Sequence, residues 1–363
     1  MTERALNDVL ASAALLVTCG PGGVGKTTTA AALGLAAARA GRRVVVVTID
    51  PARRLADALG IEGAGSNEPH LVVDAVEGPG SFSALMLDAE RTFDDLIRER
   101  AGDAAEKLLA NRVYRGIAGS LSGAQEYMAI ERVHQLHNSD DFDLVVIDTP
   151  PSRHAIDVLE APDRLVLFLS NPIYRALTMP TRSLARITSA ASTAFLWTVK
   201  RLAGPKIVEE IVEFFRSLSS MEAGLRTRAA EMSALLRDEQ TAFVLVSSPR
   251  AEAIDEATFL AQALGAGGFG LGGIVINMVH PLPAPLSAKL TTAFAKGKVT
   301  GPLAEQIGYH HELTVLAQAE RDEMRALVAL AGDAPVREIP LLDHDVHDVA
   351  TLVELGHLLM NDA

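Results

Sequence analysis

One short stretch limits the folds open to this chain more than any other. Residues 15–28 read Leu-Leu-Val-Thr-Cys-Gly-Pro-Gly-Gly-Val-Gly-Lys-Thr-Thr, which is an apolar run, a glycine-rich turn and the beginning of an alanine-rich helix. The spacing fits the phosphate-binding pattern G-x-x-x-x-G-K-[ST]. Glycines let the backbone curl so that successive N–H groups point toward phosphate oxygens. The predicted nucleotide-binding residues of this loop are Gly20, Gly22, Gly23, Val24, Gly25, Lys26, Thr27 and Thr28.

Two side chains at the start of the predicted helix add further chemistry. The Lys26 ammonium has the reach to contact β- and γ-phosphates, and the Thr27 hydroxyl is a ligand for Mg²⁺. The helix that begins near Lys26 contributes the positive end of its dipole. The alternative is a glycine turn that only joins a strand to a helix.

Apolar runs alternate with helical segments along the rest of the chain. Arg43–Ile49 is a β-branched run that is too apolar for a one-sided strand, so it predicts a buried parallel strand. The other predicted elements are strands at 15–19, 144–147, 165–169, 242–246 and 274–277, weaker strands at 71–76 and 83–87, helices at 26–40 and about 346–359, and a polar lead-in at 1–13. This alternation predicts an α/β fold, a doubly wound and mainly parallel sheet of the phosphate-loop NTPase type.

Two acidic residues follow predicted strands, where such sheets gather their chemistry. Asp148 closes an apolar run, and we expect it to hold Mg²⁺ through water. Asp50 follows the strand after the phosphate-loop helix and is predicted to orient or deprotonate an attacking water. Both carboxylates also suit the capping of a following turn or helix. Lys26 and Asp50 are the predicted catalytic residues.

Charge and cysteine content exclude several classes of function. The chain has 46 acidic and 33 basic residues, a net charge of −13, which disfavours nucleic-acid binding. Its single cysteine, Cys19, excludes an intramolecular disulfide and a Cys-x-x-Cys zinc site, and is interpreted as a small buried apolar residue. No apolar run approaches the ~18 residues of a membrane helix. We expect a cytoplasmic protein, with peripheral association at a membrane as the alternative.

Several motifs together resemble one family, the arsenite-pump and tail-anchored-protein-targeting ATPases. Residues 20–28 resemble the deviant phosphate loop G-K-G-G-V-G-K-T-T, Asp50–Leu55 resembles the first switch, and Asp148–His154 resembles the second switch. Val275-Ile276-Asn277 is similar to the adenine-reading strand end of that family. Ser248-Pro249-Arg250 and Pro340-Leu341 lie where the family has its two later nucleotide-side loops.

The resemblance implies ATP as the nucleotide, with Mg²⁺, and a face-to-face dimer that closes around it. It implies Asp50 as the residue that activates water and Asn277 as an adenine contact. Pro340 and Leu341 are further predicted nucleotide contacts.

The sequence departs from the family at Pro21, where the family has a lysine that reaches the phosphates of the partner subunit. Three explanations stay open. Another cation replaces the lysine, with Arg53 and Arg153 the nearest candidates in the sequence, or a different subunit supplies the charge, or hydrolysis is weak. The predicted partner is therefore a second copy of this chain or a paralogue that retains the lysine. The zinc-binding and arsenite-binding cysteines of the family are also missing, which argues against an arsenite function.

Residues 174–232 are predicted to form an inserted α-helical subdomain between the two parts of the ATPase domain, 1–173 and 233–363. The segment contains nine Lys or Arg residues and five Glu residues, in a chain that is acidic overall. In the resembling family this region binds the client. We expect it to contact a hydrophobic client or an anionic membrane surface, and the alternative is an ordinary subdomain core.

The leading hypothesis is an ATP-binding, ATP-hydrolysing conformational switch that couples nucleotide state to binding of a client, a membrane component or a partner subunit. The second is a catalytically weak, nucleotide-sensing regulatory subunit of a heteromeric ATPase, which Pro21 motivates. The third is a partitioning ATPase of the MinD/ParA type. Members of that class need a basic surface for DNA or membrane, whereas the C-terminal stretch here is acidic, with Asp343, Asp345 and Asp348.

Overall fold

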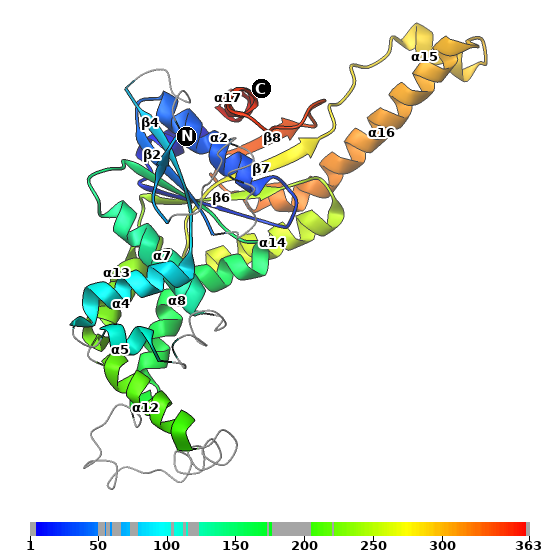
Figure 1. Cartoon of the computed structure of the whole chain (residues 1–363). Coiled ribbons are helices and arrows are strands. Elements are labelled where there is room, and N and C mark those ends of the chain that lie inside the picture. The colour runs from blue at the N-terminus through cyan, green and yellow to red at the C-terminus, as the bar shows by residue number, and fades with distance from the viewer. Residues whose placement is uncertain are drawn as a thin grey trace.

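A twisted sheet flanked by helices forms the centre of the molecule, as Figure 1 shows for a computed structural model of the chain. The structure describes residues 5–49, 55, 59, 67–72, 79–102, 105–111, 114, 123–172, 174–175, 205–219 and 221–360. The strands are β1 Leu15–Cys19, β2 Arg43–Thr48, β3 His70–Leu71, β4 Ser81–Met86, β5 Leu144–Asp148, β6 Thr241–Ser247, β7 Leu271–Val279 and β8 Val336–Pro340.

The strands follow the order β3-β4-β2-β5-β1-β6-β7-β8. Neighbouring strands run parallel, apart from the antiparallel pair β3 and β4. Every residue of β1, β5 and β6 is buried, as expected of parallel strands that are covered on both faces. The predicted doubly wound, mainly parallel sheet is confirmed.

The two faces of the sheet belong to two separate cores, because successive side chains of a strand point to opposite faces. Leu15 and Val17 lie in a core with α7, α8, α13 and α14, whereas Leu16 lies in a core with α1, α2 and α17. The described helices are α1 Leu6–Ser12, α2 Lys26–Arg39, α4 Ala89–Arg100, α5 Ala105–Leu109, α7 Ala124–His137, α8 Ser152–Ser170, α12 Pro205–Ser219, α13 Glu222–Leu236, α14 Ala251–Ala266, α15 Ala288–Ala295, α16 Pro302–Ala329 and α17 Val349–Met360.

A group of helices extends the first core away from the sheet (Figure 1). Helix α8 packs against α7, α13 and α14, and α4 packs against α5 and α7. The described part of residues 174–232 contributes Phe214, Leu218 and Leu225 to the same continuous core as the strands. The division of the chain into 1–173 with 233–363, and 174–232, stays a prediction.

A projection from the sheet, defined here as the arm (residues 281–316), consists of a segment without regular secondary structure, α15 and the first part of α16 (Figure 1). The chain leaves β7, reaches α15 at the far end and returns through α16. None of the residues of α15 is buried. The His310 Nε2 group donates to the carbonyl oxygen of Ala284 at 2.8 Å and holds the two sides of the arm together.

The base of the arm is fastened to the sheet by a carboxylate. Glu320 of α16 accepts from the backbone N–H of His280 at 2.9 Å, and its other oxygen lies 2.7 Å from the ring Nδ1 of His280. Arg321 donates to the carbonyl oxygen of His280 at 3.3 Å. Since His280 directly follows β7, these contacts join α16 to the end of that strand.

The prediction of a strand at 165–169 is wrong, because one helix, α8, runs from Ser152 to Ser170. A short apolar run does not distinguish a strand from part of a buried helix. Pro162 lies inside the helix and does not end it. Leu169 is buried and Leu167 and Phe168 are exposed, as on a helix with one covered face.

Predictions at the two ends of the chain also need correction. The supposed polar lead-in forms α1, in which Leu6, Val9 and Leu10 are buried at helical spacing. Pro340 closes strand β8, which the sequence analysis missed, and proline is tolerated there because β8 is an edge strand. The final helix begins at Val349 rather than near 346. Of the weaker strands, 83–87 corresponds to β4, while residues 73–76 lie outside the described residues.

Candidate functional site

The phosphate loop, residues 20–25, joins β1 to α2 and adopts backbone angles that favour glycine. Gly20, Gly23 and Gly25 have φ values of 151°, 74° and 91°. At Gly20 a Cβ atom would collide with the carbonyl oxygen of Val246, and at Gly25 it would lie 2.5 Å from the Asn277 side chain. The loop therefore needs glycine for both backbone conformation and space, as a close wrap around phosphate requires.

Lys26 and Thr27 begin α2 directly after this loop. The buried Lys26 side chain donates from Nζ to the carbonyl oxygen of Pro21 at 2.7 Å, so it folds back over the loop. Thr27 is half-buried and donates from Oγ1 to Asp148 Oδ2 at 2.7 Å. Both groups lie where the phosphate-binding pattern predicts them.

Asp148, the last residue of β5, is the meeting point of three elements. Its side chain is 1% exposed. The register of the sheet sets it opposite Thr18 of β1 and Thr48 of β2. Oδ2 accepts from Thr27 of α2 and from Thr48 at 3.0 Å. Thr48 is not among the predicted site residues, although a hydroxyl residue that ends a β-branched strand beside an acidic strand end is a usable signal.

Asn277 connects β7 to the phosphate loop. Its Nδ2 donates to the carbonyl oxygen of Val24 at 3.0 Å, and its Oδ1 accepts from the backbone N–H of Met278 at 3.0 Å. Leu341, which is exposed, donates its N–H to the carbonyl oxygen of Val279 at 2.9 Å, so Pro340 and Leu341 lie beside the end of β7. The structure thus brings these predicted contacts to the same edge of the sheet.

The remaining predicted residues have different outcomes. Gly22 is exposed near Pro151, and Thr28 is half-buried within α2. Asp50 and Arg53 lie outside the described residues, as does the side chain of Arg153. The catalytic role of Asp50 stays a prediction.

The donor groups of the site fit a nucleotide with a hard metal ion. Thr27 and Asp148 offer a hydroxyl and a carboxylate oxygen, the ligand type that Mg²⁺ prefers. Among the described residues, no three His, Cys, Asp or Glu side chains come together as a metal-binding group. Burial raises the pKa of the Cys19 thiol to about 12, so this residue stays protonated and is not a nucleophile at neutral pH.

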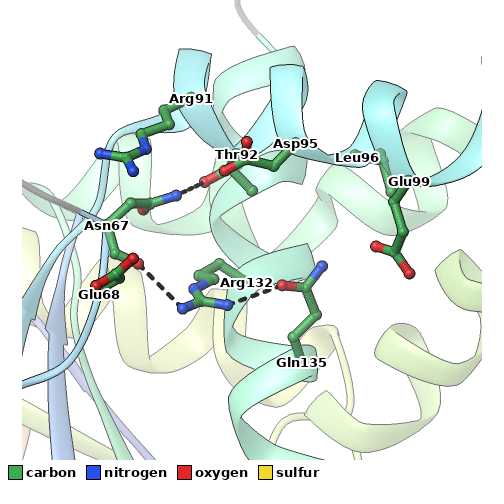
Figure 2. A pocket seen from close by; sticks show the side chains of 9 residues that line it. All are labelled: Asn67, Glu68, Arg91, Thr92, Asp95, Leu96, Glu99, Arg132 and Gln135. Carbon is green, nitrogen blue, oxygen red and sulfur yellow. Dashed lines mark hydrogen bonds between the residues drawn. The ribbon is translucent and has the colours of Figure 1, made fainter. Parts of the chain in front are cut away.

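A separate cavity of about 240 Å³ lies between α4, α7 and the chain before β3 (Figure 2). Asn67 donates from its side chain to Thr92 at 2.8 Å, and Arg132 donates to the carbonyl oxygen of Asn67 and to Gln135, each at 3.1 Å. Burial lowers the pKa of Arg132, and nearby carboxylates act in the opposite direction. None of the predicted site residues lines this cavity, so the nucleotide site and the cavity are distinct.

The strand–loop–helix unit and the carboxylate at the end of β5 define a phosphate-loop nucleotide-binding protein. The family model for anion-transporting ATPases matches residues 13–291. The chain belongs to this family, and it is an ATPase. Across the ranges that the structure describes, no helix is both long and apolar enough to cross a membrane.

Individual relatives agree with this assignment. The chain is similar to the protein SCO2128 of Streptomyces coelicolor, with 31% identity over 80% of this chain and 66% of that protein, which is just under two thirds of its length. It is similar to the ATPase GET3B of Arabidopsis thaliana, with 25% identity over 94% of this chain and 77% of the relative. The ATPase GET3 of Phaeosphaeria nodorum is 26% identical over 72% of this chain and 74% of the relative.

Proposed function

We propose that this chain is an ATP-driven conformational switch whose nucleotide state sets its affinity for a hydrophobic client, a membrane component or a partner subunit. The observation that supports it most is the Asp148 carboxylate, which accepts hydrogen bonds from both Thr27 and Thr48. This one group fastens the phosphate-loop helix to the ends of β2 and β5. A ligand that engages Thr27 and Asp148 changes an anchor that all three elements share.

In this proposal the chain's own groups have separate tasks. The N–H groups of residues 20–25 and the Lys26 ammonium bind the phosphates, and Thr28 lies beside them. Thr27 and Asp148 hold Mg²⁺, with Asp148 acting through water. When bound, ATP supplies the phosphoanhydride bond that is hydrolysed, and Mg²⁺ supplies positive charge that neutralises the phosphate oxygens. Asp50, two residues after Thr48, orients the attacking water.

The adenine side of the proposed site lies at the end of β7. Asn277 contacts the base, and Pro340 and Leu341 flank it. Support comes from the position of Leu341, whose N–H bonds the carbonyl oxygen of Val279 two residues beyond Asn277. Because Asn277 also bonds Val24, the base and the phosphates are held by one connected unit.

Helix α8 provides the route from the nucleotide to the client surface. It begins four residues after Asp148 and packs against α13 and α7. At its far end Phe168 lies near Tyr174 and Phe215, with ring centroids 5.4 and 6.1 Å apart, and Phe168 stays exposed. We propose that this aromatic cluster belongs to the client surface of residues 174–232. The test is the crosslinking of an apolar peptide to this aromatic cluster with and without ATP. A crosslinking yield that ATP does not change would contradict the coupling between the nucleotide site and the client surface.

A dimer of this chain, or a heterodimer with a lysine-retaining paralogue, completes the proposed switch. The motive is Pro21, which supplies only a carbonyl oxygen to Lys26 and no charge for a partner's phosphates. Low turnover of the purified chain that rises on addition of such a paralogue favours the regulatory-subunit alternative. Robust turnover by a homodimer excludes that alternative.

The central test uses two substitutions in the full chain. Lys26→Ala is expected to abolish ATP binding, measured by calorimetry, because the cation facing the phosphates is lost. Asp50→Asn is expected to bind ATP normally and to lower turnover by about 100-fold or more, as for loss of a general base. Arg39→Ala, at the exposed end of the same helix, is the matched control. Normal turnover in the Asp50 variant excludes the proposed base.

A further inference from the structure

Residues 281–304 of the arm differ in charge from the rest of the chain. Between Glu256 and Glu305 the sequence contains no acidic residue, whereas the chain as a whole carries a net charge of −13. Lys289, Lys296 and Lys298 lie in α15 or just after it, and all three are exposed. The far end of the arm is therefore a positive site on an acidic protein.

Apolar side chains accompany these lysines. Phe294 and Leu303 are 37% and 49% exposed. Helix α15 buries none of its residues, and Figure 1 shows it at the end of the arm farthest from the sheet. Single exposed apolar residues are ordinary, but here Phe294 and Leu303 share a projecting tip with three cations. We define Lys289, Phe294, Lys296, Lys298 and Leu303 as the tip.

We propose that the tip docks on an anionic lipid surface. Lysines near such a surface are attracted to its headgroups within about a Debye length. Phenylalanine and leucine side chains then gain by insertion at the boundary between headgroups and acyl chains. The contact involves neither residues 174–232 nor the phosphate loop, so it stands independently of the proposed function.

The shape of the tip favours lipid over a protein partner. Helix α15 has eight residues and lies on a narrow projection. A standard protein interface buries roughly 800 Å² on each partner, which a two-turn helix at the end of an arm does not provide. A lipid surface needs only a few inserted side chains and nearby cations. The tip contains one aromatic ring and no arginine, whereas proteins that bind single-stranded nucleic acid use several stacking aromatic side chains and arginines, so the tip fits lipid better.

The test is co-sedimentation of the full chain with vesicles, without nucleotide. The chain is expected to bind vesicles of phosphatidylcholine mixed with phosphatidylserine, and to bind phosphatidylcholine alone at least about tenfold less. The variant Lys289→Glu, Lys296→Glu, Lys298→Glu is expected to lower binding to the mixed vesicles by about tenfold or more. Phe294→Ser is expected to weaken it by several-fold. Since α15 buries none of its residues, both variants should retain the wild-type circular dichroism spectrum.

A matched variant controls for net charge. Arg39→Glu, Arg100→Glu, Arg325→Glu makes the same change in charge at exposed positions outside the arm, and is expected to bind like the wild type. Equal loss in this control overturns the proposal, because attraction then depends on overall charge. Equal binding to both vesicle types overturns it as well. Binding of the tip to duplex DNA in place of vesicles, or self-association that the tip variant abolishes, assigns the surface to a different partner.

Discussion

Asn277 is a single side chain that joins the end of strand β7 to the phosphate loop. It donates to the Val24 carbonyl and accepts from the Met278 N–H. Met278 has a φ of 63°, which is uncommon for a residue with a side chain. The backbone of β7 is therefore irregular directly after Asn277, where its pairing with β8 shifts register between Ile276 and Val279.

Gly25→Ala is expected to weaken ATP binding by about tenfold or more without unfolding the sheet. Gly25 has a left-handed backbone, which costs a residue with a Cβ roughly 1–2 kcal/mol. The added Cβ also lies 2.5 Å from Asn277 Nδ2, so the amide must leave the Val24 carbonyl. Calorimetric titration with ATP measures the affinity, and circular dichroism checks the fold.

Two further variants separate backbone strain from collision. Gly297 has a φ of 65°, and a Cβ added there would meet nothing within 4 Å. Gly297→Ala therefore introduces only the strain of a left-handed backbone and should leave ATP binding unchanged. In the Asn277→Ala background the collision is absent, so adding Gly25→Ala there should lower ATP affinity less than Gly25→Ala does in the wild-type background. Unchanged ATP affinity in Gly25→Ala contradicts the need for glycine at this position.

A buried ion pair fastens α13 to α7 at the scale of whole elements. Arg228 of α13 donates from Nε to Glu131 of α7 at 3.1 Å, and the two side chains are 15% and 2% exposed. Tyr127 also donates to Glu131, at 3.1 Å. Arg228→Met is expected to lower the free energy of unfolding by about 3–5 kcal/mol, because Glu131 keeps a buried charge without its cation. Urea denaturation measures the change.

The partner substitution checks that interpretation. Glu131→Gln added to Arg228→Met removes the charge that was left behind, so it should recover a large part of the lost stability. Arg164→Met breaks exposed pairs with Asp157 and Glu160 and is expected to cost less than about 1 kcal/mol. Equal losses for Arg228→Met and Arg164→Met exclude a special role for the buried pair.

The start of β2 carries an acid-sensitive contact. Hydrogen bonds from the side chain and backbone N–H of Arg43 lower the pKa of Asp143 from 3.8 to about 2. The native state thus favours the ionised carboxylate, and its stabilisation, present at neutral pH, is lost as pH falls from about 4 to about 2. Asp143→Asn is expected to reduce stability at pH 7 and to match the wild type near pH 2, by urea denaturation at each pH.

The solvent exposure of Arg43 and Asp143 limits the contribution of their contact to stability, and an exposed carboxylate nearby serves as the control. Both partners are more than one-third exposed, so solvent screening reduces the contribution. Asp141→Asn removes an exposed carboxylate two residues away and should show a much weaker pH dependence. The same loss at pH 2 and pH 7 in Asp143→Asn would assign the effect to packing rather than charge.

At the scale of the whole molecule, the sequence predicts the sheet and its active edge because the relevant signals are local. Glycines at fixed spacing predict the phosphate loop, and β-branched runs such as Arg43–Ile49 predict buried strands. The Thr27 contact with Asp148 follows from the rule that parallel strands end at one edge. The pairing of Thr48 with Asp148 depends on sheet order, since these residues are far apart in the chain.

Features that depend on tertiary context escape sequence reasoning. Residues 165–169 are apolar enough for a strand, but they continue α8, whose covered face decides their conformation. The segments that form α1 and β8 are short and carry few apolar residues, so they do not stand out in the sequence. The arm leaves almost no periodic signal because α15 has no buried face. A helix such as α15 that buries no residue has no apolar face for the sequence to show.

Because the arm is fastened at its base by His280 and Glu320, a small rotation there displaces its free end by a much larger distance. The stretch of α16 from Pro302 to Glu320 rises about 27 Å along its axis. If α16 rotated by about 10° about the His280–Glu320 contact, the free end of the arm would move by about 5 Å, several times the displacement of the residues at that contact. A distance-reporting label pair on Lys298 and the sheet would therefore register rotations too small to resolve at the strand ends themselves.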